Sequence, residues 1–270
     1  MAVFGVLYAV APGRLGRDGV GFGLLTTAIA VGTLDRVVTA PDERGDWHDR
    51  PMASSARSFV QRHTRLRPVP GLEHIRLHLA DDPLALWHAV QVATADPDTP
   101  LPYWAFAWGG GLALGHYLRD HPEAVAGRRV VDFASGSGLV AIAALDAGAA
   151  EVRAADIDPF AAAAIGLNAR ANGVRVTVMG RDVLDDAPPD VDVILAGDWA
   201  YEAVLAARVL PWLRLARERG TDVLVGDPGR RYLPTGDLVE LAAYAVRTTT
   251  ELEDLAMREG RVYRLAPPGP

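Results

Sequence analysis

Residues 130–138, which read VVDFASGSG, form the stretch that decides the fold of this 270-residue chain. Their apolar β-branched residues predict a buried strand, and the small residues that follow predict a turn where the backbone and the next helix N-terminus approach a ligand. A second strand ends in residues 154–159, AADIDP, which place the carboxylate of Asp156 directly after an apolar run. An acid about 20 positions after a glycine-rich turn is typical of sites that bind a ribose. The two junctions predict a nucleotide-binding α/β unit for a cofactor that contains adenosine. A glycine-rich turn alone is also compatible with an ordinary turn that binds no ligand.

The composition narrows the class of protein. Half of the residues are hydrophobic, which is enough for one α/β domain with a proper core, with or without an extension. The net charge is −7, and the 27 basic residues, all of them arginine, are scattered among 34 carboxylates, so the balance favours a basic protein partner over nucleic acid. The chain has no cysteine, and its seven histidines show neither metal-ligand spacing nor a nucleophile–histidine–acid arrangement. We therefore expect no metal site and no acyl-enzyme.

Residues 1–57 differ from the rest of the chain, because an apolar, glycine-rich run at 19–33 follows Arg14 and Arg17. The run is shorter than the ~20 residues that a membrane-spanning helix needs, and no convincing signal-peptide cleavage site follows it. We expect a cytoplasmic protein without stable membrane association, with export as the alternative. Residues 1–57 are expected to be a poorly ordered extension, or the product of an upstream start choice, because Met52 opens the organised part.

Residues 58–267 alternate between strand-like and helix-like segments, which predicts one domain with a largely parallel sheet. Asp82 followed by Pro83 is typical of the start of a helix. Beyond the two junctions, the predicted strands are 75–79, 174–179, 191–196 and 223–226, and the predicted helices are 84–90, 112–121, 159–171, 201–218 and 236–243. A final pair of segments, 243–249 and 261–265, is predicted to form an antiparallel hairpin that ends the sheet.

Four large rings lie within six residues just before a run of three glycines. These are Tyr103, Trp104, Phe106 and Trp108. Such rings are commonly part of a core, whereas glycines beside them suggest a flat wall with close backbone approach, which suits a ligand. The sequence leaves both interpretations open.

A family resemblance adds to these patterns. The motif Asp132-x-Ala134-x-Gly136-x-Gly138 resembles the first motif of the seven-stranded S-adenosylmethionine-dependent methyltransferases, and Asp156 matches their ribose-binding acid. The resemblance implies an α/β, Rossmann-like fold with a seven-stranded, mostly parallel sheet, an antiparallel edge hairpin and helices on both faces. It also implies S-adenosyl-L-methionine as the cofactor.

Further motifs resemble the lysine methyltransferase family of the electron-transfer-flavoprotein beta subunit and its bacterial relatives. The similarity spans about residues 59–267. The motifs are PYWA at 102–105, WGG at 108–110, DIDP at 156–159, LN at 167–168, GDWAY at 197–201 and GDPGR at 226–230. The resemblance implies a transferase that methylates a lysine of a protein substrate, with electron-transfer-flavoprotein beta subunit as the implied partner.

The same resemblance implies cofactor-binding roles. Gly136 and Gly138 would let the turn pass under the methionine and ribose, Asp156 would hold the ribose, Asp182 would accept from the adenine amino group, and Trp108 would wall the pocket. The implied set is completed by Asp132, Ala134, Ile157 and Asp198. Asp156 and Asp182 also have an alternative role as helix or turn caps.

Two neighbouring positions carry structural expectations. Ala134 replaces the glycine usual at the start of the turn, and we expect its methyl group to be tolerated if the backbone angle φ there is negative. Asp158 is expected to cap a helix, because Pro159 follows at a first helical position.

The Asp-x-x-Tyr element at 198–201 resembles the substrate signature of protein-lysine methyltransferases. Asp198 would steer and orient the amine, while Trp199 and Tyr201 would form an apolar wall that favours proton loss. As the alternative, Trp199 and Tyr201 are the first turn of a buried helix, and Asp227 either caps a turn or contacts the substrate.

Three alternative functions stay open. One is methylation of a small, nicotinamide-like amine, and another is a catalytically silent methyltransferase fold that binds a partner. A nicotinamide dehydrogenase is less favoured, because the turn offers Ala141 where the third glycine of a dinucleotide motif belongs.

Overall fold

The computed structural model describes residues 51–248 and 257–267, and the side chains from Ser55 onward. These residues belong to one unit of the chain, 46–270. Residues 1–50 of the predicted extension, and the end of the predicted segment 243–249, lie outside the described residues.

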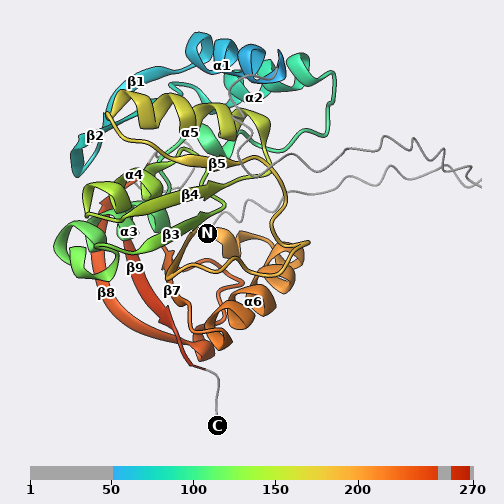
Figure 1. Ribbon diagram of the computed structural model, residues 1–270. Coiled ribbons are helices and arrows are strands. Elements are labelled where there is room, and N and C mark those ends of the chain that lie inside the picture. Colours follow the sequence, from blue (N-terminus) through green and yellow to red (C-terminus); the bar gives the residue numbers. More distant parts are fainter. Residues whose placement is uncertain (1–50, 249–256, 268–270) are drawn as a thin grey trace, which may run out of the picture. The chain divides into compact units, whose positions relative to one another are not determined.

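A seven-stranded sheet forms the centre of this unit (Figure 1). Its strands are β3 (Arg129–Phe133), β4 (Glu151–Ala155), β5 (Thr177–Met179), β6 (Val193–Gly197), β7 (Asp222–Asp227), β8 (Leu238–Arg247) and β9 (Met257–Leu265). The spatial order is β5-β4-β3-β6-β7-β9-β8. The first five strands pair in parallel, and β9 is antiparallel to both β7 and β8. The predicted α/β fold, a mostly parallel sheet with an antiparallel edge pair, is confirmed.

The helices and a separate hairpin surround the sheet. The α-helices are α1 (Pro51–His63), α2 (Pro83–Thr94), α3 (Gly109–Asp120), α4 (Leu139–Asp146), α5 (Pro159–Ala171) and α6 (Ala203–Glu218). Short 3-10 helices are η2 (Tyr103–Ala105), η3 (Pro122–Ala124), η4 (Trp199–Tyr201) and η5 (Thr235–Asp237). The hairpin consists of β1 (Arg65–Val69) and β2 (Leu72–Leu79).

Two helices begin at the aspartates that the sequence predicts as caps. The carboxylate of Asp82 accepts hydrogen bonds from the backbone N–H groups of Leu84 and Ala85 at the start of α2, 3.0 Å each. The carboxylate of Asp158 accepts from the N–H of Phe160 at 2.7 Å at the start of α5. These bonds satisfy donors that the first helical turn leaves without a partner.

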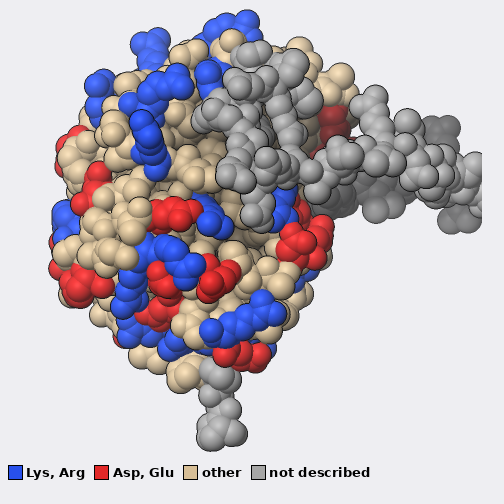
Figure 2. Space-filling model, viewed as in Figure 1, with Lys and Arg blue, Asp and Glu red and all other residues tan. Residues whose placement is uncertain are grey.

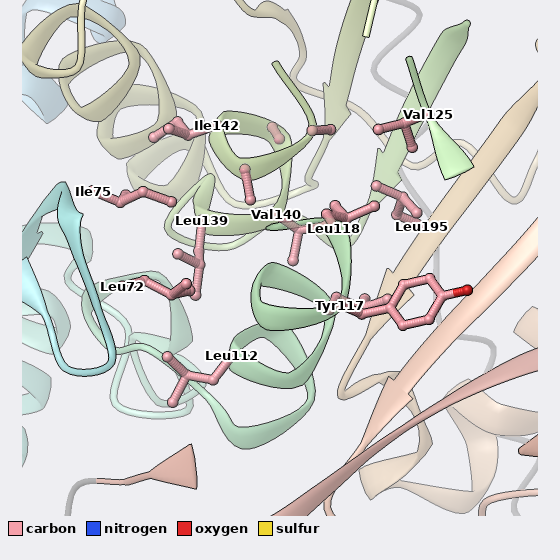
Figure 3. Packing of buried hydrophobic residues seen from close by; sticks show 14 of the residues in the cluster. Leu72, Ile75, Leu112, Tyr117, Leu118, Val125, Leu139, Val140, Ile142 and Leu195 are labelled. Carbon is pink, nitrogen blue, oxygen red and sulfur yellow. The ribbon is translucent and has the colours of Figure 1, made fainter. Parts of the chain in front are cut away.

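One face of the sheet packs on α3 and α4. Because side chains alternate along a strand, Val130 and Leu195 share this face and lie in one core cluster with Leu112 of α3 and Leu139 of α4 (Figure 3). Leu72 of the hairpin joins them, and a Cβ at Gly115 would lie only 2.6 Å from its side chain. The hairpin therefore contributes to the core on this face of the sheet.

The opposite face of the sheet packs on α6. Val131 and Ile194, the neighbours of the residues on the first face, lie in a second cluster with Trp212 and Leu213 of α6. The ring centroids of Phe133 and Trp212 are 5.4 Å apart. Both faces are thus covered, which explains the near-continuous apolar runs of the parallel strands.

A third layer links the N-terminal helices to α5. Phe59 of α1 packs against Phe160 of α5, with ring centroids 4.8 Å apart. The buried Asn168 of α5 accepts from the N–H of His78 and donates to the carbonyl of Ser137, 2.8 Å each. A single amide side chain therefore ties the hairpin to the glycine-rich turn.

The helix predicted at 236–243 is wrong. These residues contain the end of η5 and the first part of β8, which pairs antiparallel with β9 from Leu238↔Leu265 onward, with an irregularity between Glu240 and Ala242. The apolar residues of this segment suit a helix or a strand by spacing alone, and the long ladder with β9 decides for the strand.

Charged groups are distributed unevenly on the visible surface. Arginine and acidic side chains lie side by side over its lower part, whereas the upper part, over α1 and β1, shows mainly arginine (Figure 2). No helix within the described ranges is both long enough and apolar enough to cross a membrane.

Candidate functional site

A pocket of about 830 Å³ opens at the carboxyl ends of the parallel strands. From β3 the chain runs to β4 and β5 on one side of the sheet, and it then returns to β6 on the other side of β3. Ligands of open α/β sheets bind at such a reversal of strand order. Ten of the predicted site residues line this pocket: Trp108, Asp132, Ala134, Gly136, Asp156, Ile157, Asp182, Asp198, Trp199 and Tyr201.

Gly138 serves the packing beside this pocket. It is the N-cap of α4 with φ of +80°, and a Cβ there would lie 3.3 Å from the Cα of Ile165 in α5. Its missing side chain lets the two helices approach. Within the described part of the chain, the lining residues include Gly136 and do not include Gly138.

Asp132 at the end of β3 is fully buried below the glycine-rich turn. Its Oδ2 accepts from the hydroxyl of Ser135 at 2.5 Å and from the N–H of Ala141 at 3.0 Å. Burial raises the pKa of this carboxyl to about 7. Asp132 therefore holds the turn and the first turn of α4 together at the floor of the pocket.

Ala134 does not meet the condition under which its methyl group was expected to be tolerated, which is a negative backbone angle φ. Its φ is +52°, in the left-handed region. The Cβ of an L-residue in this region costs roughly 1–2 kcal/mol. The turn therefore retains the backbone shape that glycine usually provides, at a cost in strain.

Asp156 connects the turns after β3 and β4. Its Oδ2 accepts from the N–H of Gly136 at 2.8 Å, and its Oδ1 accepts from the N–H of Asp158 at 3.0 Å. Burial raises the pKa of the Asp156 carboxyl, and these backbone hydrogen bonds oppose that rise. The next residue, Ile157, is largely exposed at the pocket rim. The carboxylate is thus fixed at the pocket edge, and it also serves the capping role that the sequence left open.

Asp182 follows β5 and bonds within its own loop and to α6. Its Oδ1 accepts from the N–H of Leu184 at 2.9 Å, and its Oδ2 forms an ion pair with Arg208 at 3.0 Å. The turn-capping alternative for Asp182 is therefore present in the structure, at a position that lines the pocket.

Asp198 follows β6 and contacts two distant parts of the chain. Its Oδ2 accepts from the backbone N–H of Gly111 in the first turn of α3 at 2.9 Å, and its Oδ1 pairs with Nη2 of Arg230 at 3.0 Å. Its own N–H donates to the carbonyl of Gly226 at 2.9 Å, and its φ is +54°. A Cβ at Gly110 would lie 2.7 Å from Asp198 Oδ2, so a glycine is needed for this approach.

Arg230 is a site residue that the sequence interpretation missed. Its guanidinium lies 5.6 Å from the centroid of the Trp108 ring, an arrangement that favours a cation–π interaction. Asp227 positions it, because Asp227 Oδ1 accepts from the N–H groups of Gly229 and Arg230 at 2.6 Å each. The motif at 226–230 signalled this turn, but nothing in it indicates a partner 32 residues away.

The aromatic residues divide between core and pocket wall. Trp104 and Phe106 are buried in the layer below α5, although both also reach the pocket. The rings of Tyr103 and Tyr201 lie 5.2 Å apart and those of Tyr103 and Trp108 lie 5.6 Å apart. The aromatic run therefore contributes Trp104 and Phe106 to the core and Tyr103 and Trp108 to the pocket wall.

The two tyrosines at the pocket mouth stay protonated at neutral pH. Burial raises the pKa of Tyr201 to about 12, and burial also raises the pKa of Tyr103. Trp199, between Asp198 and Tyr201 in the chain, is almost fully buried and packs against the α6 face of the sheet. The Asp-x-x-Tyr element thus forms η4, with its carboxylate and phenol in the same pocket.

The residues present fit an adenosyl cofactor with an amino-acid tail. Asp132 in the last part of β3, Asp156 after β4 and Asp182 after β5 bring three carboxyl groups to the pocket, and apolar side chains line the walls between them. The strand order and this pocket define an S-adenosylmethionine-dependent methyltransferase. The electron transfer flavoprotein beta subunit lysine methyltransferase of Xenopus laevis is 34% identical over 224 residues, which cover 81% of this chain and 90% of that protein. This chain belongs to that family.

Further comparisons give relatives of the same description and other methyltransferases. The enzyme of the same description from Mus musculus is 38% identical over 172 residues, 62% of this chain and 68% of the mouse protein. The family described as ribosomal protein L11 methyltransferase matches residues 119–201. Among solved structures, the ribosomal protein L11 methylase of Lactobacillus delbrueckii subsp. bulgaricus is 20% identical, with a TM-score of 0.44, over 63% of this chain and 83% of that one.

Proposed function

We propose that this protein transfers a methyl group from S-adenosylmethionine to a lysine side chain of electron transfer flavoprotein beta subunit. The observation that carries the proposal is the position of Asp198, which shares one pocket with Asp156 and with the glycine-rich turn. A polar group for an amine thus lies in the same cavity as the groups for an adenosyl cofactor. The membership of the family adds the protein substrate, because that substrate is named for the relatives.

In this proposal the cofactor is held by three elements. Gly136 lets the backbone approach, Asp156 binds the ribose hydroxyls, and Asp132 lies below the turn near the amino-acid part. Trp108 walls the pocket, and Asp182 lies within reach of the adenine. The bound cofactor supplies a methyl group on a positively charged sulfur.

The residues around Asp198 prepare the lysine for attack. The amine has an unperturbed pKa of about 10.4, so presenting it without its proton at pH 7 costs roughly 4–5 kcal/mol. Apolar and aromatic groups near Tyr201 disfavour the charged ammonium by desolvation, and the phenol can donate or accept a guiding hydrogen bond. Alignment of the amine with the methyl group contributes up to roughly 7–11 kcal/mol.

The test uses purified electron transfer flavoprotein beta subunit from the same organism, tritiated S-adenosylmethionine and peptide mass spectrometry. Wild-type enzyme is compared with Asp198→Asn and Tyr201→Phe. Because the enzyme contains no lysine, it cannot label its own lysine side chains. A labelled lysine whose rate of labelling falls strongly, but stays measurable, in Asp198→Asn supports the proposal.

Two other results would overturn it. In a host lysate, label confined to the small-molecule fraction would identify a small amine as the substrate. Absence of label, together with calorimetry in which neither wild type nor Asp156→Ala binds the cofactor, would identify a silent binding module.

We further propose that residues 58–267 form the methyltransferase domain, preceded by an extension at 1–57, and that the enzyme works in the cytoplasm. Helix α1 crosses this boundary and buries Ala56, Phe59 and Val60 in one cluster, so a chain that starts at Met52 keeps these residues.

A further inference from the structure

The pair of Asp198 and Arg230 sets the charge at the place where a substrate amine would enter. The two side chains are 13% and 21% exposed, so the 3.0 Å ion pair is largely removed from water. Asp198 Oδ2 is engaged by Gly111, and the Arg230 guanidinium lies near the Trp108 ring. Both members of the pair are thus held by further partners.

An uncompensated carboxylate at this position would work against the chemistry. A negative charge within ~4–6 Å stabilises an ammonium and makes its deprotonation harder. Only the neutral amine has the electron pair that attacks a methyl group. The nearby guanidinium of Arg230 cancels the charge of Asp198 and removes this penalty.

We propose that Arg230 is a positioning residue that holds Asp198 as a neutral pair, so that the substrate amine is presented without its proton. The inference rests on the proposed function above. The lysine proton leaves to solvent, the nitrogen electron pair forms the N–C bond, and the C–S bond breaks with its electrons going to sulfur. Asp198 then orients the amine through its oxygen lone pairs, and Arg230 keeps that oxygen from acting as a bare anion.

The other charged and titratable groups do not replace Arg230 in this role. Tyr103 from η2 and Tyr201 from η4 face it and are neutral at pH 7. Glu202 and Asp156, and the buried Asp227 whose Oδ1 accepts from the N–H of Arg230, add only negative charge to their surroundings. The field of Arg230 reaches both tyrosines, where it opposes the rise in pKa that burial causes. Two further arginines line the pocket, but Arg181 pairs with Asp186 and Arg208 pairs with Asp182 and Asp185.

The first experiment measures kcat against pH from 6 to 10 on the protein substrate for wild type, Arg230→Gln and Arg230→Lys. Removing the positive charge in Arg230→Gln should shift the ascending limb of the kcat–pH curve to higher pH by about one unit. Near pH 7 this shift lowers kcat by roughly tenfold, and the difference disappears at high pH. Arg230→Lys keeps the charge and should keep the wild-type limb. An unmoved limb in Arg230→Gln, or an equal shift in Arg230→Lys, overturns the inference.

A double variant separates charge from structure. Asp198→Asn combined with Arg230→Gln removes both charges and again leaves a neutral pair. Its ascending limb should return to the wild-type position even though its maximal kcat is low, because the carboxylate is lost. If the limb stays where Arg230→Gln puts it, the effect is structural and the inference is wrong.

A binding measurement gives a readout without turnover. Calorimetry compares the Kd of S-adenosylmethionine, which carries a sulfonium, with the Kd of the uncharged sulfide S-adenosylhomocysteine. In Arg230→Gln, the affinity for S-adenosylmethionine relative to that for S-adenosylhomocysteine should increase by about tenfold. In Arg230→Lys this ratio should stay unchanged. If wild type methylates no lysine protein, the proposed function fails, while this ratio still decides the charge role of Arg230. An unchanged ratio in folded Arg230→Gln overturns that role.

Discussion

The carboxylate of Asp198 caps a helix that lies 87 residues away from it in the sequence. Its Oδ2 accepts from the N–H of Gly111 at 2.9 Å, in the first turn of α3, whose preceding residue Trp108 makes no side-chain cap bond. The negative charge also lies at the positive end of the helix dipole. The proposed substrate-binding acid therefore also stabilises the start of α3.

This arrangement predicts that Asp198 contributes to stability as well as activity. Asp198→Ala should lower the free energy of unfolding by about 2 kcal/mol, because α3 loses a cap and Arg230 loses its partner. Asp198→Asn keeps an acceptor for Gly111 and should lose about half as much. Urea unfolding monitored by circular dichroism measures both values. Equal free energies of unfolding for Asp198→Ala and wild type would show that the cap does not stabilise the protein.

The glycine-rich turn provides a matched pair of opposite predictions. Ala134→Gly should leave stability unchanged or raise it by about 0.5–1 kcal/mol, because relief of the left-handed strain exceeds the added flexibility of the unfolded chain. Gly136→Ala, at φ of +54°, should lower it by about 1 kcal/mol. Thermal unfolding of both variants, without and with cofactor, checks the signs. A stabilised Gly136→Ala would contradict the strain argument.

Local patterns predict the fold well where each segment determines its own structure. Residues 130–138 gave both the strand and the turn, and Asp158 before Pro159 gave the start of α5. The helix predicted at 236–243 failed, because its pairing with β9 is a contact between distant segments. Arg230 was missed for the same reason, since the Asp198 pair exists only after β6 and β7 lie side by side.

The buried carboxyl of Asp132 predicts a pH dependence of stability. Its folded pKa is about 7 and its ordinary value is 3.8, so between these values the unfolded chain has lost a proton that the folded chain keeps. The free energy of unfolding therefore falls with rising pH in this window, by up to about 1.4 kcal/mol per pH unit from this group. The contribution is fully present below pH ~4 and is lost as pH rises through about 7.

Asp132→Asn should remove this slope. Urea unfolding at pH 5, 6, 7 and 8 gives the free energy of unfolding of wild type and of the variant. Other titrating groups contribute equally to both proteins, so the difference between the two values reports on Asp132. Ser135→Ala serves as the control, because it removes one hydrogen bond to the carboxylate and keeps the titrating group. Parallel curves for wild type and Asp132→Asn would show that Asp132 is ionised in the folded protein throughout this range.

The last prediction concerns the start of the functional domain. A chain that begins at Met52 keeps Ala56, Phe59 and Val60, the buried residues of α1, and should fold and bind the cofactor like the full chain. Phe59→Ala in either form should lower the free energy of unfolding by about 3 kcal/mol, because it removes the contact with Phe160 and leaves a cavity. Exposed Gln61→Ala, in the same helix, is the control and should change the free energy of unfolding by less than about 0.5 kcal/mol. Loss of folding on starting at Met52, with Phe59→Ala harmless in the full chain, would show that the preceding residues stabilise the domain and that the α1 contact does not.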